Sequence, residues 1–298
     1  MAAETLALAI PTYNRPEALG MTLGGLAPAL RELGIAVHVL DDSSDDATAT
    51  VMNRLRQQGL TISYERNVPA LRHDRNVVAA LQAPQADYVW LLGDGALVDE
   101  PALRRVHAAL MGDDFVFLNC RSDTATPSLR FGAGEVRAFL ARQAWAMTYT
   151  GATVYSRRVV DWWRSQPRTV ARNFPQLSVV LGFVAAHAEV SAAWVGERII
   201  AANPRRSSSY WLADAVSVWG TDWHRVVTSH AAAFGAPALP SVLRSHSAHT
   251  GILGAKHLLA LRAIDRYAGA MLSDSGNVLA QCSTVPRWGL QLIAALPL

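Results

Sequence analysis

The chain has 298 residues, and 51% of them are hydrophobic, a composition that excludes a disordered or fibrous protein. Its formal net charge is only +3 and is carried almost wholly by arginine, which suits ligands with phosphate groups, yet no run of basic residues is dense enough to predict nucleic-acid binding. The two cysteines, Cys120 and Cys282, form neither a disulfide framework nor a metal-ligand spacing, so we expect a protein of the reducing cytoplasm.

Strand-like and helix-like segments alternate through the first 120 residues. The apolar run that begins at Leu6 stops at Pro11, a polar cluster follows at Thr12–Arg15, and an amphipathic stretch extends from Glu17 to Leu33. The next segments are expected to be strands at Ala36–Leu40, Thr61–Glu65, Asp87–Leu92 and Phe115–Cys120, and helices at Ala47–Gln58, Asp74–Leu81 and Glu100–Met111. This alternation predicts parallel strands joined by helices, with the loops after the strands gathered at the carboxyl edge of the sheet, where such sheets bind ligands.

The alternation loosens after Asp123. Later segments are expected to be helices at Phe131–Arg142, Val159–Arg164 and Phe174–His187 and strands at Thr150–Tyr155 and Ala192–Ile200. We predict an α/β fold with a doubly wound, mixed but mostly parallel sheet flanked by helices in residues 1–202. A mainly helical C-terminal region is expected in residues 203–298.

Two apolar stretches bear on membrane contact. Leu177–Gly196 is interrupted by two polar residues, which favours a buried helix that runs into a strand over a membrane span. The tail Trp288–Leu298 is too short to cross a bilayer, but its apolar composition fits a segment that lies on a bilayer surface. No basic segment precedes the first apolar run, so no signal peptide is expected. We predict a cytoplasmic protein and leave open its contact with the inner face of the membrane.

The loop after the first strand offers the chemistry that a nucleotide needs. Thr12 supplies a hydroxyl, Tyr13 an aromatic ring, Asn14 an amide and Arg15 a guanidinium. Because this loop is expected at the carboxyl edge, we predict that it contacts a ligand there.

The loop after the second strand, Asp41–Asp46, contains four carboxylates within six residues. In one interpretation Ser44 or Asp45 caps the next helix and the other acids are solvated. In the other, which the position after a strand favours, Asp41 or Asp42 accepts a hydrogen bond from a base or a ribose.

The third and fourth segments add basic and acidic groups. Arg75 begins a helix whose N-terminus can attract phosphate, although a solvated basic helix start explains that segment equally well. The strand Asp87–Leu92 is followed by Gly93 and Asp94, and a carboxylate in this setting typically holds a divalent cation against a diphosphate.

In this order, the four segments resemble the family-2 glycosyltransferases with a GT-A fold. The motifs are I-P-T-Y-N-R, D-D-S-S-D-D, an Arg-Asn pair at a helix start, and D-Y-V-W-L-L-G-D, which together extend from Leu6 to Val98. The L-L-G-D sequence is most similar to the abequosyltransferase-like branch of surface-polysaccharide enzymes. The resemblance implies transfer of a hexosyl or deoxyhexosyl group from a nucleotide-diphosphate donor to a hydroxyl of a lipid-linked or cell-surface saccharide, with inversion.

The resemblance also implies roles for residues. Thr12, Tyr13 and Arg15 would contact the nucleoside, Asp41 or Asp42 the base, Arg75 the nucleotide and Asp94 the sugar diphosphate. The predicted substrate-binding set is completed by Pro11, Arg72, Gly93, Arg205, Arg206 and Trp211. Trp211, Trp219 and Trp223 suit stacking on a sugar, although packing in the core is the more common role of tryptophan.

One departure from the family concerns metal. The family continues the fourth strand as an acidic cluster, whereas this chain has Asp94-Gly95-Ala96. A single carboxylate is a poor site for Mg²⁺ or Mn²⁺, so metal binding at Asp94 stays open. The arginines Arg72, Arg75, Arg205 and Arg206 are the alternative means to neutralise a diphosphate. No organic cofactor is expected.

A second departure concerns the catalytic base. The family has an acidic pair where this chain has Asn173–Gln176. Besides Asp94, the remaining catalytic candidates are Asp161, His187 and Glu189, for which a surface charge, a core histidine and a solvated cap are the simpler explanations. The missing acids motivate an alternative, a degenerate relative that binds nucleotide sugars or scaffolds a synthase complex without turnover. A nucleotidyltransferase is a third interpretation, but its Gly-rich phosphate loop is missing from the sequence. Oligomeric state, donor and acceptor are not predicted.

Overall fold

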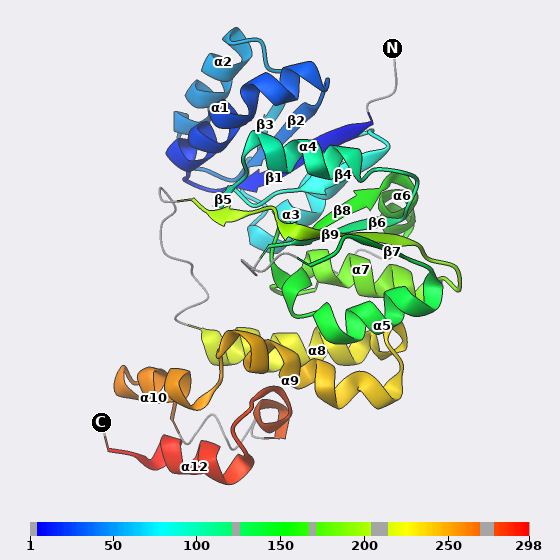
Figure 1. The fold of residues 1–298 in the computed structure, drawn as a ribbon. Helices are drawn as coiled ribbons and strands as arrows, with labels where there is room; N and C mark the ends of the chain where they lie inside the picture. The colour runs from blue at the N-terminus through cyan, green and yellow to red at the C-terminus, as the bar shows by residue number, and fades with distance from the viewer. Residues whose placement is uncertain (1–4, 121–125, 167–170, 204–213, 269–276, 298) are drawn as a thin grey trace. The chain divides into compact units, whose positions relative to one another are not determined.

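The computed structural model describes residues 5–120, 126–166, 171–203, 214–268 and 277–297 (Figure 1). The chain divides into two compact units. The first consists of Met1–Val136, Ala146–Val170 and His187–Ser207, and the second of Arg137–Trp145, Ala171–Ala186 and Ser208–Leu298. The boundary that the sequence predicts after residue 202 stays a prediction.

An eight-stranded mixed sheet forms the centre of the first unit. Its strands, in spatial order, are β3 (Ile62–Arg66), β2 (Ala36–Asp41), β1 (Leu6–Thr12), β4 (Tyr88–Leu91), β8 (Thr153–Ser156), β6 (Phe115–Asn119), β9 (Ala192–Arg198) and β7 (Leu129–Phe131). β1 to β4 run parallel, β8 is antiparallel to β4 and β6, β9 is parallel to β6, and β7 is antiparallel to β9. The central strands β1, β4 and β6 are almost wholly buried, as their apolar sequences require.

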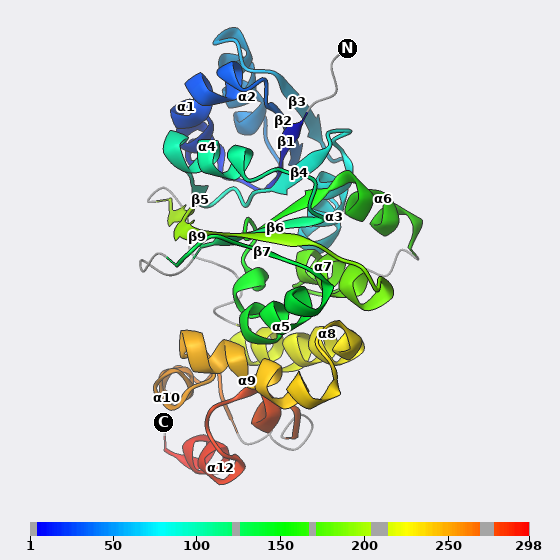
Figure 2. The ribbon, with the colours of Figure 1, turned by 45° about the vertical axis from the view of Figure 1, so that its right-hand side comes forward.

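Helices cover both faces of this sheet (Figure 2). α1 (Pro16–Glu32), α2 (Ala47–Gln57) and α4 (Glu100–Ala108) lie on one face, whereas α3 (His73–Gln82) and α6 (Arg157–Ser165) lie on the other. α1 is long enough to cover several strands because Leu19, Leu23, Leu26 and Leu30 recur at helical spacing and are all buried.

The order of the strands creates a switch point between β1 and β4. The chain moves from β1 to β2 and β3 on one side, and then returns to β4 on the other side of β1. The loops after β1 and β4 therefore meet at the carboxyl edge of the sheet, the usual ligand site of such folds. β8 runs the other way, and its last residue, Ser156, pairs with Tyr88 at the start of β4. Whatever directly follows β8 therefore lies at the amino edge.

A second, two-stranded sheet borders the carboxyl edge. β5 (Ala96–Leu97) pairs with β10 (Ala201–Ala202), two strands too short to be predicted from the sequence. The backbone N–H of Asn203 donates to the Gly95 carbonyl (3.2 Å), and its side-chain amide donates to the Ala18 carbonyl (3.0 Å) and to Thr22 Oγ1 (3.1 Å). The chain that leaves β9 is thus fastened beside the residues that follow Asp94.

The second unit is helical. Among the described residues its helices include α7 (Pro175–Ala186), α8 (Trp223–Ser229), α9 (Leu239–Thr250), α10 (Ala255–Ala263), α12 (Arg287–Ala295) and the end of α5 (Ala133–Gln143), and residues 277–282 are helical as well. A π-helical turn lies at Ser217–Asp222, and 3₁₀ turns lie at Ala231–Ala233 and Ala236–Ala238. A further 3₁₀ turn at Ala146–Thr148 belongs to the first unit.

Aromatic side chains organise the core of the second unit. Trp223 donates its Nε1–H to the Leu243 carbonyl (2.8 Å), and the Tyr267 hydroxyl donates to the Leu290 carbonyl (2.9 Å). Trp219 stacks on His246, with ring centroids 3.7 Å apart. Trp219 and Trp223 are buried, so they pack in the core as the more common role of tryptophan predicts.

The predicted fold class, a doubly wound mixed sheet flanked by helices with a helical C-terminal region, is confirmed. The apolar stretch Leu177–Gly196 forms α7 and the first part of β9, as predicted. No helix in the described ranges is long and apolar enough to cross a bilayer.

Candidate functional site

Asp94 and the loop after β1 meet at the switch point. Asp94 Oδ1 accepts a hydrogen bond from Arg15 Nη1 (2.7 Å), and Oδ2 accepts hydrogen bonds from Thr12 Oγ1 (3.0 Å) and the Tyr13 backbone N–H (3.4 Å). The side chains of Asp94 and Arg15 are 12% and 23% exposed, so the ion pair is largely shielded but not sealed. A charge-assisted pair with this shielding fixes the loop more firmly than a surface pair would.

The same loop is tied to the loop after β2. Asn14 has a φ of 52° and donates its backbone N–H to Ser43 Oγ (2.8 Å), and the Thr12 carbonyl accepts the N–H of Asp42 (3.0 Å). Tyr13 does not share this burial, because 60% of the residue is exposed. Its ring is therefore available for stacking on a ligand at this edge.

The structure distinguishes Asp41 from Asp42. Asp41 is wholly buried, where it accepts hydrogen bonds from the N–H and hydroxyl of Ser43 and from the Tyr64 hydroxyl (2.9 Å). Desolvation, together with the hydrogen bond to Asp41, raises the pKa of Tyr64 to about 12. Asp41 therefore holds the loop and strand together and has no oxygen facing a ligand.

Asp42 is arranged differently. Its Oδ1 accepts hydrogen bonds from Asn67 Nδ2 (2.7 Å) and the Leu71 N–H (3.0 Å), whereas no described residue donates to Oδ2. Asp42 is also buried, with 6% of the residue exposed, but a carboxylate oxygen without a donor can accept a hydrogen bond from a ligand that reaches it. Of the two acids that the sequence left as alternatives, the geometry favours Asp42.

The other acids of this loop have local roles. Asp45 accepts the N–H of Ala47 (3.0 Å) at the start of α2, and Asp46 pairs with Arg66. Arg66 also donates to the carbonyls of Ser43 (3.1 Å) and Ser44 (2.7 Å), which fixes the backbone of the loop. The N-cap position of α2 is Asp46, without a side-chain capping bond, so neither Ser44 nor Asp45 is the N-cap, whereas the exposed Asp46 fits the solvated role.

The start of α3 brings basic groups to the same edge. Arg72 and Arg75 are exposed, and neither forms an ion pair with a described residue. Arg72 adopts a φ of 67° with ψ of 161°, a conformation that non-glycine residues rarely adopt and that is concentrated at functional sites. Two cations beside a helix N-terminus favour an anionic ligand.

His73 belongs to this site, although the sequence analysis did not select it. The residue keeps an exposed surface, yet atoms packed around its ring desolvate it and lower its pKa, against the opposing charges of Asp74, Asp94 and Asp42. These interactions place the imidazole among the carboxylates of the carboxyl edge. Its position directly after Arg72, in the segment already noted for phosphate binding, was the available signal.

Asp94 does not fit a divalent-cation site. Both of its oxygens are engaged, one by a guanidinium, so a metal ion would have to displace Arg15. No group of three or more His, Cys, Asp and Glu side chains in the described ranges could hold a metal ion. A cation at Asp94 would therefore need further oxygen ligands from a diphosphate, and the positive charge beside Asp94 in this structure comes from Arg15.

The remaining substrate-binding candidates are placed in part. Pro11 lies in β1, and Gly93 lies at the edge, where an added Cβ would approach the Thr150 carbonyl to 3.4 Å. Arg205, Arg206 and Trp211 lie outside the described residues.

The structure does not bring Asp161, His187 and Glu189 to Asp94. Asp161, on α6 directly after β8, pairs with Arg164 (2.7 Å), which in turn donates to carbonyls that precede β4. The His187 ring lies against Trp162 of the same helix, with centroids 5.7 Å apart, and Glu189 is an exposed residue just before β9. All three therefore lie at the amino edge, and Asp94 is the one catalytic candidate placed at the carboxyl edge.

The segment that replaces the expected acidic pair belongs to the second unit. Asn173 has a φ of 66° and donates its side-chain N–H to Asp222 Oδ2 (2.7 Å). Arg172 and Arg225 also approach this carboxylate, to 3.6 Å and 3.4 Å. The Asp222 side chain is only 2% exposed, so it serves to join α7 and α8 within this unit.

Comparisons of the sequence with known proteins relate the chain to glycosyltransferases. The model of glycosyl transferase family 2 matches residues 7–160, which include all four loops of the site. The chain is 28% identical to the abequosyltransferase RfbV of Salmonella typhimurium over 121 residues, which are 40% of this chain and 36% of that protein. The chain thus matches little more than a third of that relative's length.

Solved structures share the fold. TarS 1–349 from S. aureus has a TM-score of 0.64 at 11% identity, covering 97% of this chain and 90% of that one, and it has also been solved with UDP-GlcNAc. The mannosyltransferase PcManGT from Pyrobaculum calidifontis, solved with GDP-Man and Mn²⁺, has a TM-score of 0.56 at 15% identity, covering 95% of this chain and 86% of that one. At such identities the likeness concerns the fold.

Proposed function

The chain belongs to glycosyl transferase family 2, and from this premise we propose that it transfers a hexosyl or deoxyhexosyl group from a nucleoside-diphosphate sugar to a hydroxyl of a saccharide. The observation that carries the proposal is the meeting of Thr12, Tyr13 and Arg15 on Asp94 at the switch point of the sheet. Loops of both half-sheets meet there, and such crevices bind nucleotides.

The donor's nucleoside is assigned to Tyr13 and Asp42. The exposed Tyr13 ring stacks on the base, and Asp42 Oδ2 accepts a hydrogen bond from the base or the ribose. The hydrogen bonds that Asn67 and Leu71 donate to Oδ1 hold this carboxylate in place before the donor arrives, which lowers the entropy lost on binding.

The diphosphate is assigned to the start of α3. Arg72 and Arg75 are exposed cations beside the N–H groups of a helix N-terminus, and guanidinium pairs with phosphate through two hydrogen bonds. Arg15, held by Asp94, contributes a fixed positive group on the other side of the loop. We propose that these arginines, with Arg205 and Arg206 as further candidates, neutralise the charge of the diphosphate in place of a divalent cation.

The reaction places a defined demand on these groups. The acceptor hydroxyl oxygen attacks the anomeric carbon, the bond from that carbon to the diphosphate oxygen breaks, and its electron pair stays on the diphosphate. Cations fixed beside that oxygen stabilise the charge as it develops. The hydroxyl proton passes to a base, for which Asp161, His187 and Glu189 are poorly placed because they lie at the amino edge. Inversion is the outcome of one such displacement.

The acceptor is the less supported half of the proposal. The match to an abequosyltransferase supports a lipid-linked or cell-surface saccharide as the acceptor class. We assign this acceptor to residues 203–298 and the protein to the cytoplasm, at the inner face of the membrane.

The experiment that tests the proposal is a donor titration. Thermal shift with UDP-, GDP-, CDP- and dTDP-sugars, each with Mn²⁺ and with EDTA, is expected to give a shift for one nucleotide class that persists in EDTA. Slow hydrolysis of that donor, or transfer to a saccharide, is expected to follow. A shift that requires Mn²⁺ would contradict the role of the arginines, and no shift with any donor would contradict the function itself. Binding without hydrolysis or transfer would support the degenerate alternative.

A further inference from the structure

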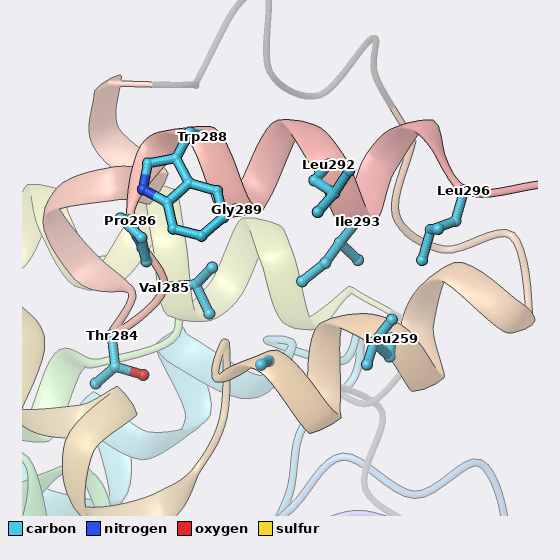
Figure 3. Close-up of a pocket in the computed structure, with 10 residues that line it drawn as sticks. Leu259, Thr284, Val285, Pro286, Trp288, Gly289, Leu292, Ile293 and Leu296 are labelled. Carbon is cyan, nitrogen blue, oxygen red and sulfur yellow. The ribbon is translucent and has the colours of Figure 1, made fainter.

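The second unit has an apolar groove between α10 and α12, with a volume of about 600 Å³ (Figure 3). Its walls include Leu259 of α10 and Trp288, Leu292 and Leu296 of the C-terminal segment. Thr284 is the one polar side chain among the residues that line it. The groove is therefore suited to an apolar occupant.

The apolar surface extends outside the groove. Trp288 and Leu292, one helical turn apart on α12, are 70% and 60% exposed, and Leu296 and Leu259 are exposed as well. Five of the ten large hydrophobic residues that are exposed in the described ranges lie between Leu259 and Leu296. An apolar patch this concentrated marks an interaction site rather than chance exposure.

The two elements that line the groove carry charges of one sign, and the acid that follows α10, Asp265, pairs with Arg262 (3.6 Å). The elements that line the groove, Ala255–Ala263 and 284–296, carry Lys256, Arg262 and Arg287 and no acidic residue. Arg262 is used within the unit, where its Nε and Nη2 donate to the Leu296 carbonyl (2.9 and 2.7 Å) and join α10 to the end of α12. Lys256 and Arg287 are exposed, and each directly adjoins a residue that lines the groove, Ala255 and Trp288.

We propose that α10 and α12 form a docking surface for a lipid bilayer with anionic head groups. Trp288 and Leu292 enter the interfacial region, and Lys256 and Arg287 contact head-group phosphates. A tryptophan and leucines on the outer face of a short helix, with cations beside them, are the composition of interfacial helices. A second copy fits this surface less well, because a two-fold interface would bring its cations together. The proposal goes beyond the glycosyl-transfer function and does not depend on it.

The test is sedimentation of the full chain with vesicles. We expect binding to phosphatidylcholine vesicles that contain phosphatidylglycerol, weaker binding at high salt because head-group attraction is screened, and little binding to phosphatidylcholine alone. The variant Trp288→Ser/Leu292→Ser is expected to reduce the partition coefficient by about tenfold or more, since it removes the side chains that enter the bilayer.

A matched control removes exposed apolar surface elsewhere. Met111 and Leu129, 69% and 52% exposed in the first unit, are changed together to Gln, which is expected to leave vesicle binding unchanged. Lys256→Glu/Arg287→Glu is expected to abolish the preference for anionic vesicles. All variants change exposed residues, so their thermal midpoints are expected to match that of the wild type.

Three results would overturn the proposal. The first is equal vesicle binding by the Trp288→Ser/Leu292→Ser variant and the wild type, and the second is equal binding to neutral and anionic vesicles. The third is a wild-type dimer in light scattering that becomes a monomer in this variant, because that result would assign the surface to a second copy. Donor binding is measured on the same proteins and is expected to be unchanged. If the wild-type protein binds no donor, the proposed function is contradicted, whereas the proposal of vesicle binding stands.

Discussion

An Arg–Asp ion pair lies at each edge of the sheet in the first unit, but the two pairs have different roles. At the amino edge Asp114 accepts hydrogen bonds from Arg158 Nη1 (2.8 and 3.0 Å) and from the Ser191 N–H (3.1 Å), which joins α6 to the chain that enters β9. At the carboxyl edge Asp94, which follows β4, is held by Thr12, Tyr13 and Arg15 at the end of β1 and in the loop after it. Both pairs link separate elements, but the one at the amino edge fixes a helix against the sheet, whereas the one at the carboxyl edge fixes the two loops that form the surface there.

The surroundings of the two pairs support this distinction. The carboxyl edge has exposed groups without a structural task, among them the Tyr13 ring, Arg72 and Arg75. The amino edge has the ion pair of Asp161 with Arg164, which is satisfied within the fold. In such a sheet, strand direction rather than the acid itself sets which carboxylates lie at the edge where ligands bind.

The largest expected effect comes from breaking the carboxyl-edge pair. Asp94→Asn keeps the shape of the side chain but removes the charge that holds Arg15, so donor binding and kcat/KM are expected to fall by about a hundredfold. Donor titration and initial rates measure this. Asp161→Asn, at the amino edge, is the matched control and is expected to leave both quantities unchanged. Equal losses in the two variants would remove the distinction between the edges.

Breaking the amino-edge pair is expected to affect stability instead. Asp114→Asn removes a buried carboxylate, 7% exposed, that pairs with Arg158 and accepts the Ser191 N–H, and the free energy of unfolding is expected to fall by about 2 kcal/mol. Urea unfolding measures this loss, while the dissociation constant of the donor is expected to stay that of the wild type. A selective loss of donor binding with unchanged stability would reverse the roles assigned to the two edges.

A smaller effect is expected from Tyr13. Tyr13→Ala removes an exposed ring that makes no core contact, so donor affinity is expected to fall by roughly tenfold with no change in stability. Tyr13→Phe keeps the ring and is expected to bind like the wild type. If the Phe variant loses as much affinity as the Ala variant, the hydroxyl rather than stacking is responsible.

Much of the carboxyl edge could be predicted from the sequence because buried parallel strands fix where their loops lie. The apolar runs before Thr12, Asp41 and Asp94 identified β1, β2 and β4, and the three loops do meet at one edge. The sequence could not show which of Asp41 and Asp42 keeps an oxygen for a ligand. That difference depends on the turn at Ser43 and on the Tyr64 hydroxyl of a neighbouring strand. Ligand roles for these residues stay predictions.

The direction of β8 could not be predicted. The residue pattern of Thr153–Ser156 identifies a strand but not its orientation, which is set by pairing with β4 and β6. Because β8 runs antiparallel to β4, Asp161 lies at the amino edge, away from the carboxyl edge where a catalytic base would be needed. The same lack of long-range information concealed the pairing of β5 with β10 beside Asp94.

The smallest expected effect tests whether His73 belongs to the carboxyl edge. Desolvation lowers its pKa in the folded state, so the unfolded chain takes up a proton at higher pH than the folded one. The stabilising contribution is therefore fully present above the unfolded pKa of about 6.5 and is lost as pH falls through the lowered folded value. Urea unfolding at about pH 7.5 and about pH 5.5 measures the loss, which is expected to be smaller in His73→Gln than in the wild type. An equal loss in His73→Gln and the wild type would place the effect elsewhere in the fold.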